Sequence, residues 1–490
     1  MIRYAGLLLL ASCSASAAPR AATDVDLARE GEAAVALLRE MLRIDTTNPP
    51  PPGAGWGGES ALCRRVQALL AEDGIASEIY EPVPGRGNLV ARLRGSGAKK
   101  PLMLMAHIDV VGVERERWSA DPLGGEIRDG FLWGRGALDD KDDAAVMVQV
   151  MRILARTRPA LERDVILMLN GDEESSGTYG ARWMVEKHWD KIACELVISE
   201  GGRTALRGDR IAQVELMTAE KVYVDLKVWV RGVAGHSSVP IPLNAVYGLS
   251  KILAALETHK TPVRVMPAVA AYMAGLSDLP VYAALRGLLK KTSEGDLEAA
   301  EQLCTDPRWN AMLRTTVVPT MLRSGIRENV LPADAEANLN VRMLPGDDLE
   351  KLVASLMKHA GVERYELLRG TAATFEAWKK QPSGPPVAVF VADHSVDAPA
   401  TPHDTEAYRR MEKVARALAP GAVVVPRLAT GATDLRFLRM KGVHGFGISP
   451  CPTGEDEERT VHGHDERVRV DSVKFGVRFV HDLVLALAGT

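Results

Sequence analysis

Short apolar runs alternate with helix-like segments along the first half of the chain. The runs at 101–106, 164–169 and 195–199 are almost wholly hydrophobic, which is typical of short strands buried on both faces. The segment that follows Asp140 has helical spacing and is apolar nearly all round, so it predicts a buried helix. Alternating strands and helices predict an α/β fold with a mostly parallel, doubly wound sheet and helices on both faces.

Further elements precede this pattern. Helical periodicity predicts helices at 26–42 and 60–72, and apolar alternation predicts strands at 75–80 and 88–93. Between the two helices, four successive prolines and several glycines predict a loop.

The pattern changes near residue 218. Residues 222–230 alternate between apolar and polar, as in a strand with one exposed face. This segment predicts a small α+β domain, with a helical insertion at 266–315 whose role the pattern does not indicate. Its other expected elements are helices at 244–256 and 349–359 and strands at 326–330, 335–343 and 365–368.

Doubly wound elements return after about residue 380. The expected elements are helices at 405–418 and 470–488, strands at 422–426 and 443–448, and a segment at 435–440 that follows a glycine-containing turn. The sequence therefore predicts a catalytic-type domain in two segments, 23–218 and 371–490. The α+β domain, 219–370, is inserted between them as a lid.

The first residues have a different character. Residues 1–22 combine Arg3, an apolar centre and small residues, which predicts an export signal and a periplasmic or extracellular location. Residues 10–13 resemble a bacterial lipobox, which would make Cys13 a lipid anchor and the protein a membrane-anchored lipoprotein. Ordinary cleavage before Ala18 is one alternative, and a short buried helix is another. No later run approaches the about 20 apolar residues of a spanning helix, so none is expected.

Composition narrows the classes of partner and of site. The chain of 490 residues has a formal net charge of −4 and no basic run, which argues against nucleic acid as a partner. Apart from Cys13, four scattered cysteines form no C-x-x-C pair, so neither a disulfide framework nor a cysteine metal site is indicated.

Histidine and acidic residues follow the predicted buried strands. His107 and Asp109 end the run at 101–106, Glu173 and Glu174 follow the second run, and Glu200 follows the third. Right-handed connections place the carboxyl ends of parallel strands along one edge, so these side chains are expected to converge. The alternative for 103–109 taken singly is a core histidine beside a helix-capping aspartate, but packing is a poor explanation for several such clusters.

Five residues suit a pair of divalent metal ions: His107, Glu174 and Glu200, together with Asp139 and His462. Two imidazoles and three carboxylates without thiolates are typical of catalytic zinc, and Asp139 could bridge two ions. A water between them has a pKa far below that of bulk water, and Glu173 could take its proton. Asp109 could orient His107. No Gly-x-Ser-x-Gly elbow or phosphate-binding loop is present, which weakens serine-hydrolase and nucleotide-binding interpretations.

Six further motifs are specific: HIDVV at 107–111, WGRGALDDK at 133–141, GDEESSG at 171–177, SEGG at 199–202, GHSSVP at 235–240 and ENVLPADAEANLNVRMLPGD at 328–347. Through these motifs the chain, from about residue 45 onward, resembles the M20 family of zinc peptidases and amidohydrolases, most of all its carboxypeptidase S and N-acyl-amino-acid hydrolase branch.

The resemblance implies a specific set of metal ligands. His107, Asp139 and Glu200 would hold one zinc ion of each subunit, with Co²⁺ or Mn²⁺ as alternative metals. Asp139, Glu174 and His462 would hold the second, and Glu173 would act as general base.

The resemblance also implies roles for the inserted domain. This domain would form a homodimer, and its His236 would reach the partner's active site to polarise the scissile carbonyl. Asn329 and Arg342 would contact substrate, Arg342 through a terminal carboxylate.

A glycine-containing turn would complete the substrate site. The backbone N–H groups of Gly431, Ala432 and Thr433 would receive the substrate carboxylate. The sequence departs from the family pattern at Ala432, where a second glycine is usual, and at Gly112, where proline is common. His464 is an alternative to His462 as a ligand.

The implied activity is hydrolysis of an amide bond next to a free carboxylate, in a short peptide or an N-acyl amino acid. Two alternatives belong to other classes. A catalytically silent binding protein would lack a ligand or the general base, and an aminopeptidase-type metalloenzyme would have an acidic pocket for a free amine.

Overall fold

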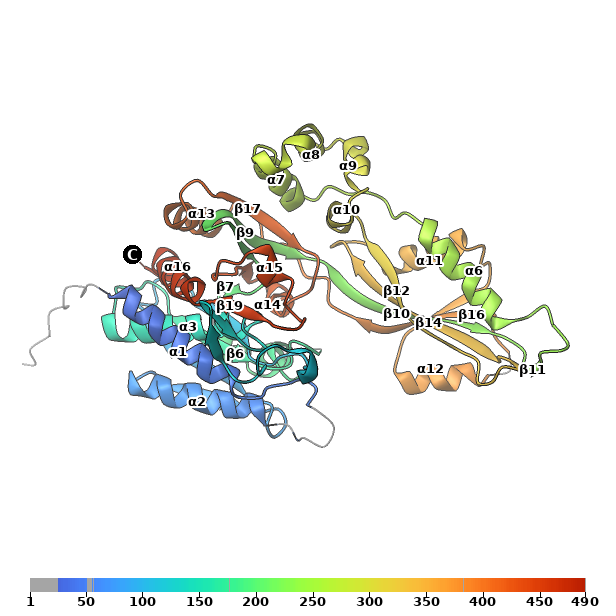
Figure 1. The fold of residues 1–490 in the computed structure, drawn as a ribbon, viewed down its shortest axis with the longest axis horizontal. Helices are drawn as coiled ribbons and strands as arrows, with labels where there is room; N and C mark the ends of the chain where they lie inside the picture. Colours follow the sequence, from blue (N-terminus) through green and yellow to red (C-terminus); the bar gives the residue numbers. More distant parts are fainter. Residues whose placement is uncertain (1–24, 51–54, 56, 176, 382, 490) are drawn as a thin grey trace, which may run out of the picture.

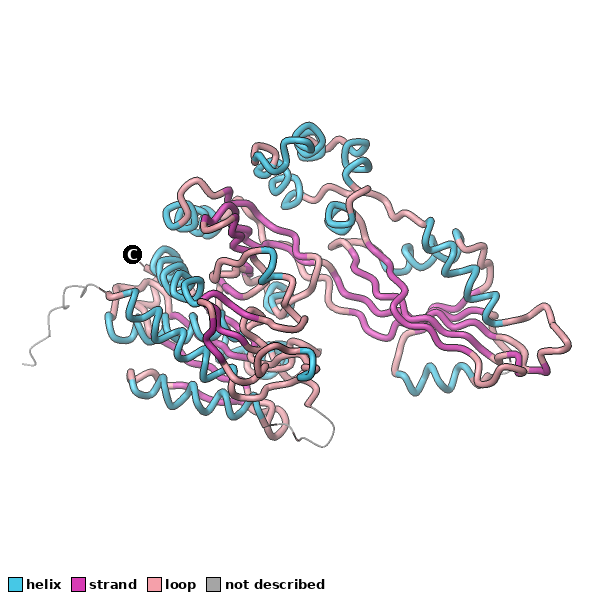
Figure 2. Tube along the Cα trace, viewed as in Figure 1, coloured by secondary structure: helices cyan, strands magenta, loops and turns pink. Residues whose placement is uncertain are grey.

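The computed structural model describes residues 25–50, 55, 57–175, 177–381 and 383–489, and these form two parts joined by extended strands (Figures 1 and 2). The expected signal at 1–22, with Cys13, lies outside the described residues. The larger part contains a nine-stranded sheet between helices, and the smaller part contains a five-stranded sheet.

The nine-stranded sheet has the order β1-β2-β6-β3-β7-β18-β9-β17, and β8 pairs with β9. Its central strands β6, β3, β7 and β18 run parallel, which confirms the predicted fold class. The strands are β1 (Ser77–Tyr80), β2 (Asn88–Leu93), β3 (Leu102–His107), β6 (Val165–Asn170), β7 (Leu196–Ser199), β8 (Arg203–Arg207), β9 (Arg210–Glu220), β17 (Val423–Ala429) and β18 (His444–Gly447).

Helices cover both faces of this sheet, which explains why its central strands are continuously apolar. Leu102 and Leu104 of β3 pack towards one helical layer, and Met103 and Met105 pack towards the other. The first layer contains α1 (Leu27–Leu42), α2 (Gly58–Glu72), α3 (Lys141–Thr157), α13 (Glu406–Leu418) and α16 (Val470–Ala488). The second contains α4 (Ala181–Lys187), α5 (Trp189–Ile192) and α14 (Leu435–Arg439).

The smaller sheet has the order β12-β14-β10-β16-β15. Its strands are β10 (Val222–Arg231), β12 (Thr316–Ser324), β14 (Asp334–Met343), β15 (Tyr365–Leu368) and β16 (Val387–His394). One face packs against α6 (Ala245–Thr258) and α11 (Leu349–His359), and the other packs partly against α12 (Ala372–Lys379). A two-stranded ribbon of β11 (Gly235–His236) and β13 (Val330–Leu331) lies at the end of this part that is remote from the larger part (Figure 1).

Two expectations for the inserted domain are wrong. The strand expected at 326–330 instead lies earlier, as β12, because β12 is an exposed edge strand interrupted at Pro319 and so lacks a buried apolar stripe. The end of the domain, expected at 370, is too early. The strand β16 pairs with β10 and β15, so the second sheet continues to His394.

The helical insertion expected at 266–315 is confirmed, and it bridges the two parts. It contains α7 (Pro267–Leu276), the 3-10 helix η2 (Pro280–Leu285), α8 (Arg286–Ser293), α9 (Leu297–Leu303) and α10 (Pro307–Leu313). Its apolar core includes Val425 and Leu428 of β17. The ammonium of Lys221, between β9 and β10, donates to the carbonyls of Ala311 at 2.9 Å and Arg314 at 2.7 Å.

The remaining elements lie outside the two larger sheets. They are the 3-10 helix η1 (Arg115–Arg117), α15 (Glu455–Glu458) and a three-stranded sheet of β4 (Glu126–Arg128), β5 (Phe131–Trp133) and β19 (Arg467–Arg469). Among the described residues, no single helix is long and apolar enough to cross a membrane, although the bent pair Pro267–Leu276 and Pro280–Ser293 meets the length and composition criteria together.

Candidate metal centre and adjoining cavity

The five predicted metal ligands converge at the carboxyl ends of the parallel strands. Two groups have ligand atoms that all lie within 4.8 Å of one another. One consists of His107, Asp139 and Glu200, and the other of Asp139, Glu174 and His462. The pairing of β3 with β6 sets His107 opposite Asn170, three residues before Glu173, so the strand register produces this convergence.

Asp139 lies between the two histidines. Its Oδ1 is 2.9 Å from Nε2 of His107, and its Oδ2 is 3.0 Å from Nε2 of His462. His462 is also 3.1 Å from Glu174. Because Asp139 presents a different oxygen to each group, it can serve two ions at once.

Glu466 brings the loop of His462 to this edge. The buried carboxylate of Glu466 accepts hydrogen bonds from the N–H groups of Gly136 at 3.1 Å and Leu138 at 2.8 Å, and it pairs with Arg135 at 2.5 Å. His464, the alternative ligand, belongs to neither group and lies 3.8 Å from Glu114.

Asp109 connects the surrounding loops through hydrogen bonds. Its carboxylate accepts hydrogen bonds from the N–H groups of Glu173 and Glu174, both at 3.1 Å, and from Nδ2 of Asn48 at 2.8 Å. Nδ1 of His107 lies 3.0 Å from the Asp109 carbonyl and 3.4 Å from its carboxylate. Asp109 is therefore placed to orient His107, and it also holds the loop that carries both glutamates.

The electrostatics of the site fit divalent cations. Burial raises the pKa of Glu173 well above its usual value, and repulsion from Glu200 adds to the increase. Burial also raises the pKa of Glu200 to about 8, opposed by His107 and reinforced by Asp139. Crowding buried carboxylates is costly unless cations bind between them, and imidazole and carboxylate donors without thiolates suit divalent metal ions.

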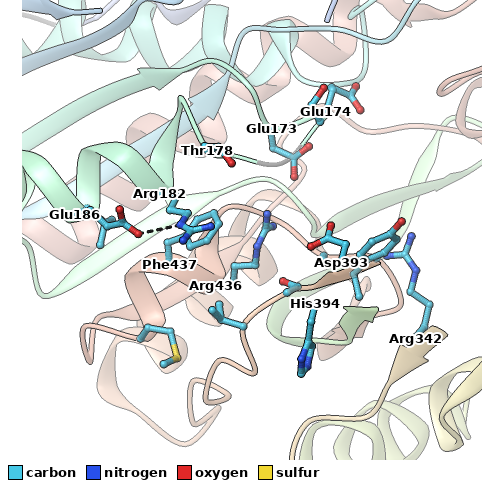
Figure 3. A pocket seen from close by; sticks show the side chains of 18 of the residues that line it. Glu173, Glu174, Thr178, Arg182, Glu186, Arg342, Asp393, His394, Arg436 and Phe437 are labelled. Atoms are coloured by element: carbon cyan, nitrogen blue, oxygen red, sulfur yellow. Dashed lines mark hydrogen bonds and ion pairs between the residues drawn. The ribbon is translucent and has the colours of Figure 1, made fainter. Parts of the chain in front are cut away.

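A cavity of about 830 Å³ adjoins the ligand groups and is lined by both parts of the molecule (Figure 3). Glu173 and Glu174 lie together in its lining. Arg342 lies on one side, stacked over Tyr223 with 4.6 Å between the guanidinium carbon and the ring centroid. Phe437 lies on the opposite side. The cavity therefore combines apolar, positively charged and acidic side chains next to the ligand groups.

Only some of the residues that were expected to bind substrate line the cavity. Arg342, Gly431 and Ala432 line the cavity. Thr433 does not, because its N–H and its hydroxyl both donate to Glu220.

Asn329 and His236 also lie outside the cavity. They are neighbours, since the Asn329 carbonyl accepts a hydrogen bond from Ser237 at 3.1 Å, and both are exposed. The strand that carries His236, β11, is at the remote end of the inserted domain (Figure 1). Within one chain, His236 therefore does not reach the ligand groups.

Sequence reasoning missed several cavity residues. Arg436 lies in the cavity wall, where its Nη1 donates to the Thr433 carbonyl at 2.6 Å. Asp393 and His394 line the cavity from the end of β16 (Figure 3). The only available signal was the position of Arg436 three residues after Thr433. Nothing in the local pattern marks Asp393 or His394.

Comparison with known proteins agrees with this geometry. The family model for peptidase family M20/M25/M40 matches residues 103–486. An N-fatty-acyl-amino acid synthase/hydrolase of Xenopus tropicalis is 26% identical over 466 residues, covering 93% of this chain and 86% of the relative. A probable carboxypeptidase S-like protein of Dictyostelium discoideum is 24% identical over 397 residues, covering 79% of this chain and 71% of the relative.

Solved structures share the fold. An M20 family metallo-carboxypeptidase from Sulfolobus solfataricus superposes with a TM-score of 0.68 at 18% identity, covering 92% of this chain and 98% of the other. A Bacillus subtilis protein described as a dinuclear metal-binding peptidase of the M20 family gives a TM-score of 0.59 at 14% identity, covering 94% and 98%. Because the family model matches most of the chain, including every candidate ligand, the protein belongs to peptidase family M20/M25/M40.

Proposed function

We propose that the protein hydrolyses an amide bond next to a free carboxylate, in a short peptide or an N-acyl amino acid, with two zinc ions per subunit. The observation that carries the proposal is the convergence of two ligand groups on Asp139, with Glu173 beside them in the lining of a cavity that Arg342 also lines.

The ligand set supports two metal sites that share Asp139. His107 and Glu200 would complete one site, and Glu174 and His462 the other. When bound, such ions supply positive charge that acidifies water and stabilises negative charge on the carbonyl oxygen. Zinc suits this mixture of nitrogen and oxygen donors, and Co²⁺ or Mn²⁺ are alternatives.

Glu173 is the residue placed for proton transfer. It belongs to neither ligand group, yet it lines the cavity next to Glu174. Its backbone is anchored on Asp109 at 3.1 Å, which directs the loop towards the metal site. Glu173 would accept a proton from the attacking water and then transfer it to the leaving amine.

Arg342 supports recognition of a free carboxylate. Its guanidinium is held by stacking on Tyr223 and by donation from Nε to Asn340 at 3.2 Å. Burial lowers the pKa of Arg342, although arginine remains charged at any ordinary pH. Gly431 and Ala432 line the same cavity, and their backbone N–H groups could bind the same carboxylate. The relatives' names, which refer to N-fatty-acyl-amino acids and to carboxypeptidases, agree with this substrate class.

The remote position of His236 supports a homodimer formed through the inserted domain. The outer edge of β12 pairs with no other described strand, and it exposes Met321 by 70% and Leu322 by 68%. On α6, Tyr247 is 70% exposed. Exposed apolar surface of this kind beside an open strand edge favours association. In such a dimer His236 would complete the partner's cavity.

One observation supports a second candidate function, an aminopeptidase-type activity on substrates with a free amine. Asp393 and Glu186 line the cavity and could pair with an ammonium group, as an aminopeptidase-type activity would require. Dipeptides with free and with acetylated amines distinguish this second candidate from the first. Loss of hydrolysis on acetylation would favour the aminopeptidase.

The test is a panel of N-acyl amino acids, dipeptides and their C-terminal amides, assayed before and after chelation. We expect hydrolysis of free carboxylates only, loss on chelation, and recovery with Zn²⁺, Co²⁺ or Mn²⁺. Glu173→Gln should reduce kcat about 10²- to 10⁴-fold with metal still bound. The matched control is Glu412→Gln on α13, which should keep full activity. Undiminished hydrolysis by Glu173→Gln would contradict the mechanism.

A further inference from the structure

Arg86 is a buried cation that takes no part in the proposed reaction. Its side chain is 1% exposed and lies among three polar groups from distant parts of the chain. Its Nε is 2.7 Å from Glu59, its Nη2 is 2.6 Å from Asp172, and its Nη1 donates to Oδ1 of Asn48 at 3.1 Å. A buried guanidinium with this many directed contacts fixes the geometry of its partners.

Asn48 connects Arg86 to the metal site. Its Nδ2 donates to Asp109 at 2.8 Å and to Asp172 at 3.2 Å. Its Oδ1 accepts from Arg86 and from the hydroxyl of Ser175 at 3.1 Å. Arginine can only donate and a carboxylate can only accept, so the amide of Asn48 fits between them in one orientation.

The hydrogen-bond partners of Asn48 include residues within and beside the loop at 171–175, which carries Glu173 and Glu174. Asp109 holds the loop through the N–H groups of both glutamates. Within the loop itself, the Asp172 carboxylate accepts hydrogen bonds from Arg86 and Asn48. All the anchoring groups except Ser175 are buried, so water competes weakly for these hydrogen bonds.

We propose that Asn48 and Arg86 are positioning residues that hold Asp109 and the loop at 171–175 in the geometry that binds metal. The inference rests on the proposed two-metal function. Through Asp109 the pair acts on His107, and through the loop it acts on Glu174, so one network reaches a ligand of each group. Groups that orient metal ligands typically contribute 10- to 100-fold in metal affinity or activity.

The test uses two variants of the full chain. Asn48→Leu keeps the number and branching of the side-chain heavy atoms but removes all four side-chain hydrogen bonds. Arg86→Lys keeps the charge, but one ammonium group cannot reach Asn48, Glu59 and Asp172 in the same directions. Zinc affinity is measured by competition with a chromophoric chelator, and ligand geometry is measured from the visible absorption of the Co²⁺-loaded protein.

We expect zinc to bind about 10- to 100-fold more weakly in both variants, with an altered Co²⁺ spectrum. At saturating metal, kcat should fall while KM stays close to its wild-type value, because the substrate-binding side chains are untouched. Should Arg86→Lys fail to fold, Ser175→Ala removes one link of the same network, and a weaker affinity in it and in Asn48→Leu would still support the proposal.

The matched control is Arg314→Lys. Arg314 is also buried and pairs with Glu301 and the Thr261 carbonyl, but it lies in the inserted part. The Arg314→Lys variant should lose stability and keep the metal affinity of the wild-type protein. The proposal is overturned if Asn48→Leu and Arg86→Lys likewise lose only stability, with wild-type zinc affinity, spectrum and kcat. If the wild-type protein neither binds two ions nor hydrolyses the panel, the proposed function fails instead.

Discussion

The carboxylate of Glu220 accepts hydrogen bonds from both donors of Thr433, the backbone N–H and the hydroxyl, the latter at 3.0 Å. Its other oxygen pairs with the buried Arg439 at 2.9 Å. Glu220 is the last residue of β9, directly before Lys221 and the strand that enters the inserted domain (Figure 1). The turn that borders the cavity is therefore held by a residue at the junction of the two parts.

Glu220→Gln should loosen this turn. The carboxamide can still accept from Thr433, but it leaves Arg439 without its charge partner, and breaking a buried pair typically costs about 3 kcal/mol of stability. We expect KM for free-carboxylate substrates to rise about 10-fold with kcat nearly unchanged, because charge-assisted contacts are worth more than neutral ones. Steady-state kinetics and denaturant unfolding measure both effects. An unchanged KM would show that the contact between Glu220 and the turn does not affect substrate binding.

Arg342→Leu should weaken binding of the substrate carboxylate. Hydrogen bonds to a charged group contribute about 1.5–3 kcal/mol, so kcat/KM should fall about 10- to 100-fold for free carboxylates. Any slow hydrolysis of the C-terminal amides should change much less. Arg369→Leu, a half-exposed arginine of the same domain, is the control. An equal decrease in kcat/KM for free carboxylates and for C-terminal amides would show that Arg342 does not recognise the carboxylate.

Lys221 should make stability depend on pH. Burial, with a further contribution from Arg342, lowers the pKa of Lys221 from 10.5 to about 7 in the folded protein. The unfolded chain then binds more protons between these values, so stability should rise with pH across this window, by at most about 1.4 kcal/mol per unit. Urea unfolding of the wild-type protein and Lys221→Met from pH 7 to 10 measures the difference. A difference that does not grow with pH would contradict the assignment.

Complementation tests the role of His236 across a dimer. Glu173→Gln and His236→Ala should each be nearly inactive. In a mixed dimer, the subunit with intact Glu173 would receive the intact His236 of its partner, so random mixing should restore roughly a quarter of wild-type activity. Leu322→Arg in both variants should abolish the recovery by disrupting the proposed interface. Two variants that stay inactive after mixing would exclude action in trans.

Much of the fold follows from local patterns. The helices α11 and α16 and the strands β2 and β15 begin and end at the expected residues. Their apolar spacing is strong, and α11 also has Asp348 as a capping residue, which accepts from the N–H group of Glu350 at 2.9 Å. The exposed strand β12 was misplaced because a strand that buries little has little pattern to read.

The candidate ligands were predictable for a different reason. Parallel strands bring their carboxyl ends together whatever their side chains are, so His107, Glu174 and Glu200 follow from the strand order. The Asn48–Arg86 network did not follow, because Asn48 is 124 positions from Asp172 and looks like an ordinary loop residue. Glu220 is separated from Thr433 by even more of the chain, 213 positions, and lies at the end of an otherwise unremarkable strand.

The sequence by itself determined the layered α/β architecture, the inserted domain and the convergence of the candidate metal ligands. These depend on periodicity and on strand order, which are local or topological properties. Only the tertiary structure decided that Thr433 donates its hydrogen bonds to Glu220, that His236 lies away from the cavity of its own chain, and that Asp109 anchors the loop of Glu173. Each of these depends on which donor meets which acceptor across a long chain separation, and packing settles that choice after the elements have formed.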